Sequence, residues 1–159
     1  MRRITYNLDN VGGLSSVLAI PVEHYNRIMS RITIVNCLVS VSTDTFVVSI
    51  PVLDNDTFSY EENQQTEDGG ELYTINIKGE IPRVDSSPSL IRDLEYGRWI
   101  VVCKDKNGQL RCAGTKKVPM DFHGGKSMGS TGSTNGIAFT FSCSQERPSI
   151  IVSEGLVIE

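Results

Sequence analysis

The fold class of this chain is decided by the stretch Glu71-Leu72-Tyr73-Thr74-Ile75-Asn76-Ile77-Lys78-Gly79-Glu80-Ile81. Apolar and polar residues alternate along it, so that Tyr73, Ile75 and Ile77 share one face of an extended chain. A period of two residues is typical of a β-strand with one buried face. We therefore expect a strand over residues 71–81.

The composition extends this expectation to the whole chain. Its 159 residues include 15 Val and 15 Ile but only 10 Leu and three Ala. β-Branched side chains lose rotamer freedom in a helix and pack well on a pleated sheet, whereas alanine and leucine favour helices. These proportions predict a mainly β fold and exclude an all-helical one, and the length fits a single domain over residues 1–159.

Further strands are expected on both sides of this stretch. Alternating or β-branched segments occupy residues 16–21, 32–41, 46–52, 98–105, 109–115, 137–143 and 149–152. The polar residues 42–45 predict a hairpin between two of these segments. Residues 22–29 leave two alternatives open, which are one or two helical turns or an irregular crossing.

One helix is expected at residues 86–97. The segment opens with a serine cap and a proline in its first turn, places three apolar residues on one stripe, and ends at Gly97. It is the only substantial helix that the sequence predicts.

The segments 98–105 and 109–115 flank Asn107-Gly108, a dipeptide typical of two-residue hairpin turns. In that register Cys103 lies opposite Cys112, and both face the core together with Trp99 and Val101. A four-residue loop would shift the register and reverse these faces. A disulfide between the two cysteines is geometrically possible, but buried thiols in a reducing compartment are the favoured interpretation.

Two stretches are too polar to supply a core, an acidic one at about 54–70 and a Gly/Ser/Thr-rich one at about 123–135. Between Arg31 and Lys78 the chain has eight acids and no Lys or Arg, although its total charge is only −4. Such asymmetry is typical of a solvated loop and also of charge complementarity between neighbouring subunits. We interpret both stretches as loops or arms. Their candidate subunit-interface or lumen residues are Asp54, Asp56, Glu61, Glu62, Glu67, Asp68, Lys126, Ser127 and Thr131.

Charge and spacing argue against several kinds of site. A pI of about 5.2 is unsuited to a protein that binds nucleic acid tightly by neutralising phosphates. The four cysteines and two histidines lack the spacing of a zinc site, and the acid pairs lack that of a calcium loop. The run Gly124-Gly125-Lys126-Ser127 lacks the earlier glycine and the following apolar helix of a phosphate-binding loop. No metal or other cofactor is expected.

The remaining catalytic candidate is the pair Asp121 and His123, whose spacing would suit a hydrolase. No Gly-x-Ser-x-Gly turn supplies a nucleophile, so an enzyme is not expected. No apolar run approaches the roughly 20 residues that span a bilayer. Residues 1–9 are too polar for a signal-peptide core, so a cytoplasmic chain is expected.

Five segments occur in a characteristic order: the strand at 71–82, the helix around 90–94, the run 99–108, the piece 111–115 and the strand 135–142. In this order they resemble small virion structural proteins of Bacteroidetes phages and prophages, including those of crAss-like phages. A valine-rich strand with an Asp-x-Asn-Gly hairpin and a closing Asn-Gly-aromatic-x-Phe strand recur in that group. The resemblance covers roughly the C-terminal half of the chain and, more weakly, the opening strand at Gly12-Gly13-Leu14.

The resemblance implies a tail-tube-like antiparallel β-sandwich or barrel with one flanking helix. It also implies assembly with copies of the same chain into a ring of the tail or head–tail connector, beside portal or tail proteins. Such a ring belongs to a virion assembled in the bacterial host cytoplasm, with DNA as passing cargo that is not specifically bound and with no membrane partner. An acidic lumen suits this role because it repels phosphate. The alternative is a monomeric β-sandwich binding module, for example for carbohydrate, which would need exposed aromatic side chains.

Overall fold

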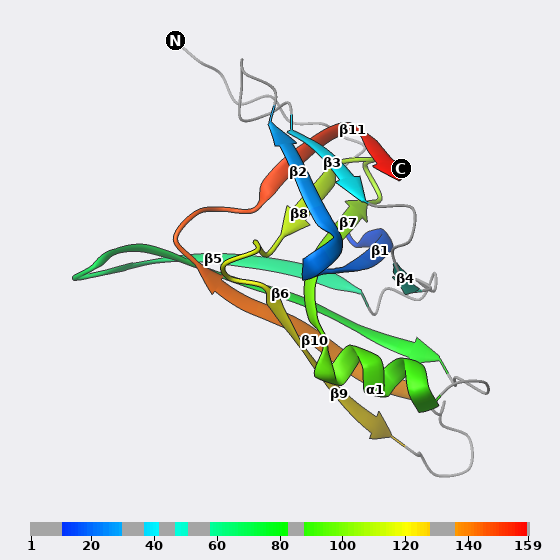
Figure 1. Cartoon of the computed structure of the whole chain (residues 1–159). Helices are drawn as coiled ribbons and strands as arrows, with labels where there is room; N and C mark the ends of the chain where they lie inside the picture. Colours follow the sequence, from blue (N-terminus) through cyan, green and yellow to red (C-terminus); the bar gives the residue numbers. More distant parts are fainter. Residues whose placement is uncertain are drawn as a thin grey trace.

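The computed structural model describes residues 11–29, 37–41, 47–50, 58–82, 88–127 and 136–158 (Figure 1). The elements are β1 (Leu14–Pro21), the 3-10 turn η1 (Val22–His24), β2 (Tyr25–Met29), β3 (Cys37–Val41), β4 (Val48–Ile50), β5 (Ser59–Glu67), β6 (Gly70–Pro82), α1 (Pro88–Tyr96), β7 (Arg98–Asp105), β8 (Leu110–Ala113), β9 (Met120–Ser127), β10 (Gly136–Gln145) and β11 (Ile150–Ile158). The described part of the chain is therefore mainly β, as the composition predicts, and contains one α-helix.

The strands follow the order β2-β3-β11-β8-β7-β9-β10-β6-β5, with β1 on the other edge of β7 and β4 beyond β1. Every pairing between described strands is antiparallel except the parallel pair β3 and β11. The order begins and ends on different strands, so the sheet is not closed into a barrel. The fold is that of an open, sandwich-like β protein.

β7 is the strand at which the sheet divides into two layers. Its first residues, Arg98 and Trp99, pair with β9, whereas residues 101–104 pair with β8. β1 pairs along most of β7. One layer therefore contains β5, β6, β10 and β9, and the other contains the remaining strands (Figure 1).

The main core lies between these two layers. Ile75, Ile77 and Phe141 contribute to it from the first layer and Val101 from the second, and each of these side chains is completely buried. A second cluster, which includes Ile100, covers the opposite face of β1, β7 and β8. β7 is thus buried on both faces, which explains its nearly continuous apolar sequence.

The strand at 71–81 and the helix at 86–97 are confirmed. β6 buries Ile75, Ile77 and Ile81 on one face, and α1 ends where the Gly97 amide donates a hydrogen bond to the carbonyl of Asp93. Trp99, near the start of β7, also contacts the end of the helix, because its indole Nε1 donates a hydrogen bond to the Leu94 carbonyl at 2.9 Å.

The predicted register of the hairpin between β7 and β8 is wrong by one residue. Asp105 pairs with Gln109 around a three-residue loop, so Cys103 lies opposite Arg111 and not opposite Cys112. The loop needs a residue with positive φ at its end, which Gly108 supplies with a φ of +88°. The two cysteines consequently point to opposite faces of the sheet, and both are buried thiols.

Two further expectations about the N-terminal half are corrected or settled. β3 and β4, the described parts of the two segments, do not pair with each other: β3 pairs with β2 and β11, while β4 pairs with β1. The predicted turn at residues 42–45 lies outside the described residues. Residues 22–29 form the single turn η1 followed by the strand β2, so neither a longer helix nor an irregular crossing occurs there.

Both polar stretches contain strands where loops were expected. Residues 59–67 form β5, which pairs with β6 along its whole length, and residues 120–127 form β9, which pairs with β10. Phe139 lies between two glycines, with Gly79 opposite it on one neighbouring strand and Gly124 opposite it on the other. Its ring packs against those of Phe58 and Phe122, so the glycines leave room for an aromatic cluster.

Candidate functional site

The structure places the sequence-predicted site residues at two opposite ends of one layer. Glu61, Glu62 and Asp68 belong to the hairpin formed by β5 and β6. The segment 126–127 ends β9 beside the first residues of β10, whereas the last residue of β10 pairs with Tyr73, four residues after the turn of that hairpin (Figure 1). The two polar stretches therefore do not form a single site.

Some of the predicted residues are not placed in detail. Asp54, Asp56 and Thr131 lie outside the described residues. Glu67, Lys126 and Ser127 are placed through their strand pairing, with Gly70, Ile137 and Gly136 respectively.

Glu61 and Glu62 are neighbours on β5 but point to opposite faces of the strand. Glu61 forms a solvent-exposed ion pair with Lys78, with 2.9 Å between Oε2 and Nζ. Glu62 is half-buried and accepts three hydrogen bonds, from Tyr60 Oη at 2.5 Å and from Ser149 through its Oγ at 2.7 Å and its backbone N–H at 3.0 Å. Glu62 is thus a structural carboxylate that joins β5 to the segment before β11.

The environment of Glu62 favours its charged form. Burial raises the pKa of this carboxyl, but the hydrogen bonds from Ser149 and Tyr60 and the positive charge of Arg111 outweigh that effect. The pKa of Glu62 is therefore lower than its ordinary value of 4.5. Burial, followed by the hydrogen bond to Glu62, raises the pKa of Tyr60 well above 10, so this phenol stays protonated as a donor.

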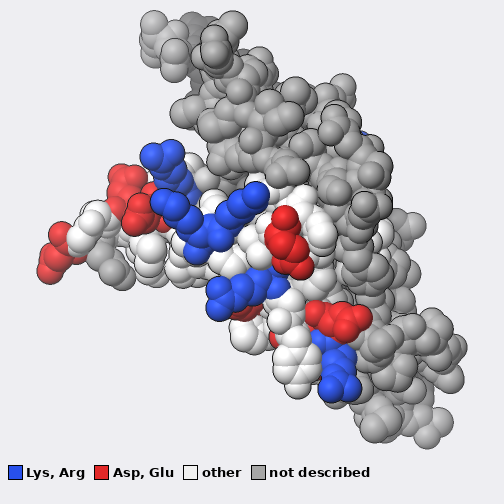
Figure 2. Space-filling model, in the orientation of Figure 1, with Lys and Arg blue, Asp and Glu red and all other residues white. Residues whose placement is uncertain are grey.

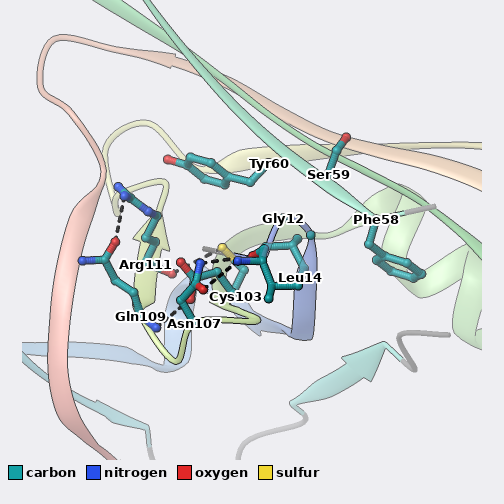
Figure 3. Close-up of a pocket in the computed structure, with 12 residues that line it drawn as sticks. Gly12, Leu14, Phe58, Ser59, Tyr60, Cys103, Asn107, Gln109 and Arg111 are labelled. Atoms are coloured by element: carbon teal, nitrogen blue, oxygen red, sulfur yellow. Dashed lines mark hydrogen bonds between the residues drawn. The ribbon is translucent and has the colours of Figure 1, made fainter. Parts of the chain in front are cut away.

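A pocket of about 300 Å³ lies beside this carboxylate, between the start of β5, residues 11–14 and the hairpin of β7 and β8 (Figure 3). The guanidinium of Arg111 lies 5.6 Å from the centre of the Tyr60 ring, and it donates a hydrogen bond to Gln109. Asn107 makes two hydrogen bonds with the backbone of Val11. The contact between Arg111 and Tyr60 joins the hairpin to β5, and the hydrogen bonds of Asn107 join the hairpin to the segment before β1.

Cys103 also lines this pocket, but its chemistry does not suit nucleophilic catalysis. Burial raises the pKa of the Cys103 thiol to about 12, and the nearby Cys112 contributes in the same direction. The nucleophile in cysteine enzymes is the thiolate, which forms readily only when the pKa is lowered. At neutral pH Cys103 is a protonated side chain of the core.

The hairpin of β5 and β6 extends beyond the sheet as an arm, which we define as residues 65–72. The last residue of β6 that pairs with β10 is Tyr73, so residues 65–72 pair only with one another. At about 3.3 Å per residue, the turn at Gly69 lies roughly 13 Å beyond that last pair. Figure 1 shows the arm projecting away from the rest of the chain. It has three acids and no Lys or Arg.

A larger, open groove of about 950 Å³ lies at the base of the arm. We call it the basic groove, because Lys116 and Lys117 from the β8–β9 connection and Arg147 after β10 line it, together with one acid, Glu146. All four charged side chains are exposed. Figure 2 shows Lys and Arg side chains gathered beside the acidic arm on this side of the molecule.

Gln145 lines the same groove and is only 6% exposed. Its side-chain Nε2 donates to the Arg147 carbonyl at 2.7 Å, which fixes the orientation of the amide. Among the described residues Gln145 Oε1 has no hydrogen-bond donor. Because the oxygen atom itself is buried, it is not accessible to a ligand in the groove.

Asp121 and His123 are both exposed on β9, and neither lines the pocket or the groove. Their neighbours on the paired strands are Ser142 and Thr140. Within the described part of the chain, no three His, Cys, Asp or Glu side chains come close enough to hold a metal ion.

The residues of the basic groove were missed by sequence reasoning. The doublet Lys116-Lys117 was visible, but it lies about 30 residues before Arg147 and more than 40 after Leu72, which also lines the groove. The register of β10 with β6 brings Leu72 near the end of β10, and the pairing of β9 with β10 brings the connection before β9 to the same place. The sequence feature that could have indicated a basic surface was the excess of Lys and Arg over acids outside the acidic stretch.

Over the residues that the structure covers, no helix is long and apolar enough to cross a membrane. No known family model, curated protein or solved structure matches the chain.

Proposed function

We propose that this chain is a virion structural protein of a bacteriophage, a subunit of a homo-oligomeric ring in the tail or head–tail connector that forms part of the DNA conduit. The proposal rests on the order of sequence segments that resembles such proteins and on one structural observation. That observation is the arm formed by β5 and β6, which projects from the sheet and has an open edge.

The open edge supports association with further copies. β5 is the last strand of the sheet order, so among the described strands it pairs on one side only. An open strand edge presents backbone donors and acceptors that another chain can pair with. The exposed side chains of β5 are acidic or polar, which discourages unspecific aggregation while leaving the edge available to a complementary partner.

The charge of the chain supports a conduit over a DNA-binding clamp. The net charge is −4, and the acids are concentrated between residues 44 and 71. A channel that passes DNA functions best when its wall does not bind phosphate, and a negative wall repels it.

The alternative of a carbohydrate-binding module has less in its favour. Such modules bind sugars on exposed aromatic rings, and Tyr96 is the one exposed aromatic side chain among the described residues, at 81%. Trp99, the single tryptophan, is 3% exposed. The described surface thus offers no row of rings.

The oligomeric state of the purified full-length chain tests the proposal. We expect native mass spectrometry to detect a closed oligomer of defined size and negative-stain electron microscopy to show rings. A chain that remains monomeric over the whole accessible concentration range, and that is absent from phage particles analysed by mass spectrometry, would contradict the proposal.

A shortened arm provides the matched variant. Replacing residues 66–71 with Asn-Gly joins Gln65 to Leu72, which are already paired, through a two-residue turn. We expect this variant to keep the thermal stability of the wild type, because residues 66–71 pair only with one another, and to lose the rings. Rings of normal size formed by this variant would show that the arm is not part of the subunit interface.

A further inference from the structure

We infer that the basic groove is the docking site for the arm of a second copy of this chain, a contact that depends on the proposed assembly of the chain into a ring. The occupant is the acidic tip around Asp68 and Glu71, and the receiving side chains are Lys116, Lys117 and Arg147. Two observations carry it, the complementary charges of the two surfaces and the fact that they are different surfaces of one chain.

The charges of the arm and the groove are complementary, since the arm has three acids and the groove is lined by three cations and one acid. Among the described residues the one ion pair joins Lys78 to Glu61, which leaves Lys116, Lys117 and Arg147 without an acidic partner. Asp68 is exposed at the turn, and Glu71 is exposed with a hydrogen bond from Tyr73. Placing the acidic tip of another copy in the groove pairs these two sets of charges.

The geometry of such a contact leads to a ring. The arm and the groove are different surfaces of the same chain, so the contact is head-to-tail and not self-complementary. A head-to-tail contact continues from subunit to subunit until the rotation closes it into a ring, or extends it as a filament. Because the groove lies at the base of the arm, each subunit can receive one arm and offer its own to the next.

Charge reversal tests the inference. One variant reverses the groove (Lys116→Glu with Lys117→Glu), a second reverses the arm (Asp68→Lys with Glu71→Lys), and a third combines all four substitutions. We expect each of the first two to raise the concentration for half-assembly at least about tenfold, because like charges then face each other, and the third to restore assembly. Sedimentation velocity and native mass spectrometry measure the assembly.

Arg92→Glu with Lys104→Glu is the matched control. Both side chains are exposed, neither lines the groove, and the change in net charge equals that of the groove variant. The control is expected to assemble like the wild type. Circular dichroism on every variant verifies that its fold is retained.

A zero-length carbodiimide cross-link on the wild type tests the contact directly. Mixing ¹⁵N-labelled and unlabelled chains before reaction identifies links between different copies. We expect mixed-isotope links that join Lys116 or Lys117 to an acid of the arm.

Several outcomes would overturn the inference. A wild type that assembles, together with reversed variants that assemble equally well, excludes the groove as the docking site and leaves the proposed function standing. A wild type that stays monomeric excludes both. Binding of duplex DNA that is lost in the groove variant, with assembly unchanged, would identify a polyanion and not the arm as the occupant.

Discussion

Glu62 and Ser149 are joined by two hydrogen bonds, although 87 residues separate them in the sequence. The backbone N–H and the hydroxyl of Ser149 both donate to the carboxylate, at 3.0 and 2.7 Å. This contact fastens the edge strand β5, which continues into the arm, to the segment that leads into β11. It also separates the role of Glu62 from that of its neighbour Glu61, although the sequence offers them as equivalent acids.

Replacing Glu62 is therefore expected to destabilise the fold. Glu62→Gln retains the shape of the side chain but removes its charge, which weakens hydrogen bonds that are strengthened by ionisation. We expect the free energy of unfolding to fall by about 1–2 kcal/mol in a chemical denaturation experiment. Glu61→Gln is the control, with an expected change within about 0.5 kcal/mol because its ion pair is exposed. Equal effects of the two substitutions would contradict the structural role of Glu62.

The contribution of Glu62 is also expected to depend on pH. The pKa of Glu62 is lower in the folded chain than its ordinary value of 4.5, so the folded state binds the proton less readily than the unfolded state. The stabilisation is therefore complete above about pH 4.5 and is lost as the pH falls through the folded-state pKa. The difference in free energy of unfolding between the wild type and Glu62→Gln should stay constant near neutral pH and shrink in acid. A difference that grows in acid would show that the sign is wrong.

Gly79 is expected to tolerate no side chain. A Cβ at this position would lie 2.7 Å from Phe58 Cδ1 and 3.0 Å from Phe139 Cζ, within a buried aromatic cluster. We expect Gly79→Ala to lower the free energy of unfolding by about 1–3 kcal/mol, which thermal or chemical denaturation measures. Gly125→Ala in β9 is the control, since nothing lies within 4 Å of its added Cβ and alanine is less flexible than glycine in the unfolded chain. A loss of stability at Gly125 as large as that at Gly79 would rule out crowding as the cause.

The core cysteines are expected to resist alkylation in the folded chain. Burial raises the pKa of the Cys103 thiol to about 12 and that of Cys143 to about 11, so little thiolate is present at neutral pH. Peptide-level mass spectrometry after iodoacetamide treatment should find Cys103 and Cys112 largely unlabelled in native protein and fully labelled in guanidinium chloride. A Cys103–Cys112 disulfide in non-reduced digests would contradict the observed register.

The predictions from sequence succeeded where the signal was local. The alternation at 71–81 and 137–143 corresponds to β6 and β10, with Ile75, Ile77 and Phe141 completely buried. The punctuation around 86–97 corresponds to α1. In these segments the hydrophobic period matches the geometry of one element, so neighbouring residues contain the necessary information.

The failures concern features that distant residues decide. Asn107-Gly108 predicts a two-residue turn, but the N–H of Lys106 donates to the Gly13 carbonyl and Asn107 binds Val11, and these contacts accompany a three-residue loop. β5 has no apolar alternation after Tyr60, because it is an edge strand with solvent on much of its surface. Such a strand forms because β6 supplies its backbone hydrogen-bond partners, and the sequence of β5 alone does not indicate a strand.

Composition and residue patterns were enough to predict a mainly β chain, a helix at residues 86–97 and a cluster of eight acids between residues 44 and 71. The folded chain was needed to show that the acidic stretch includes a paired strand ending in an arm, and that Lys116, Lys117, Arg147 and Gln145 line one groove. The physical reason is the separation in sequence between the residues that create each feature. Side-chain periodicity reports the burial of one element, whereas an arm and a groove are created by where strands end relative to neighbours that lie far away in the sequence.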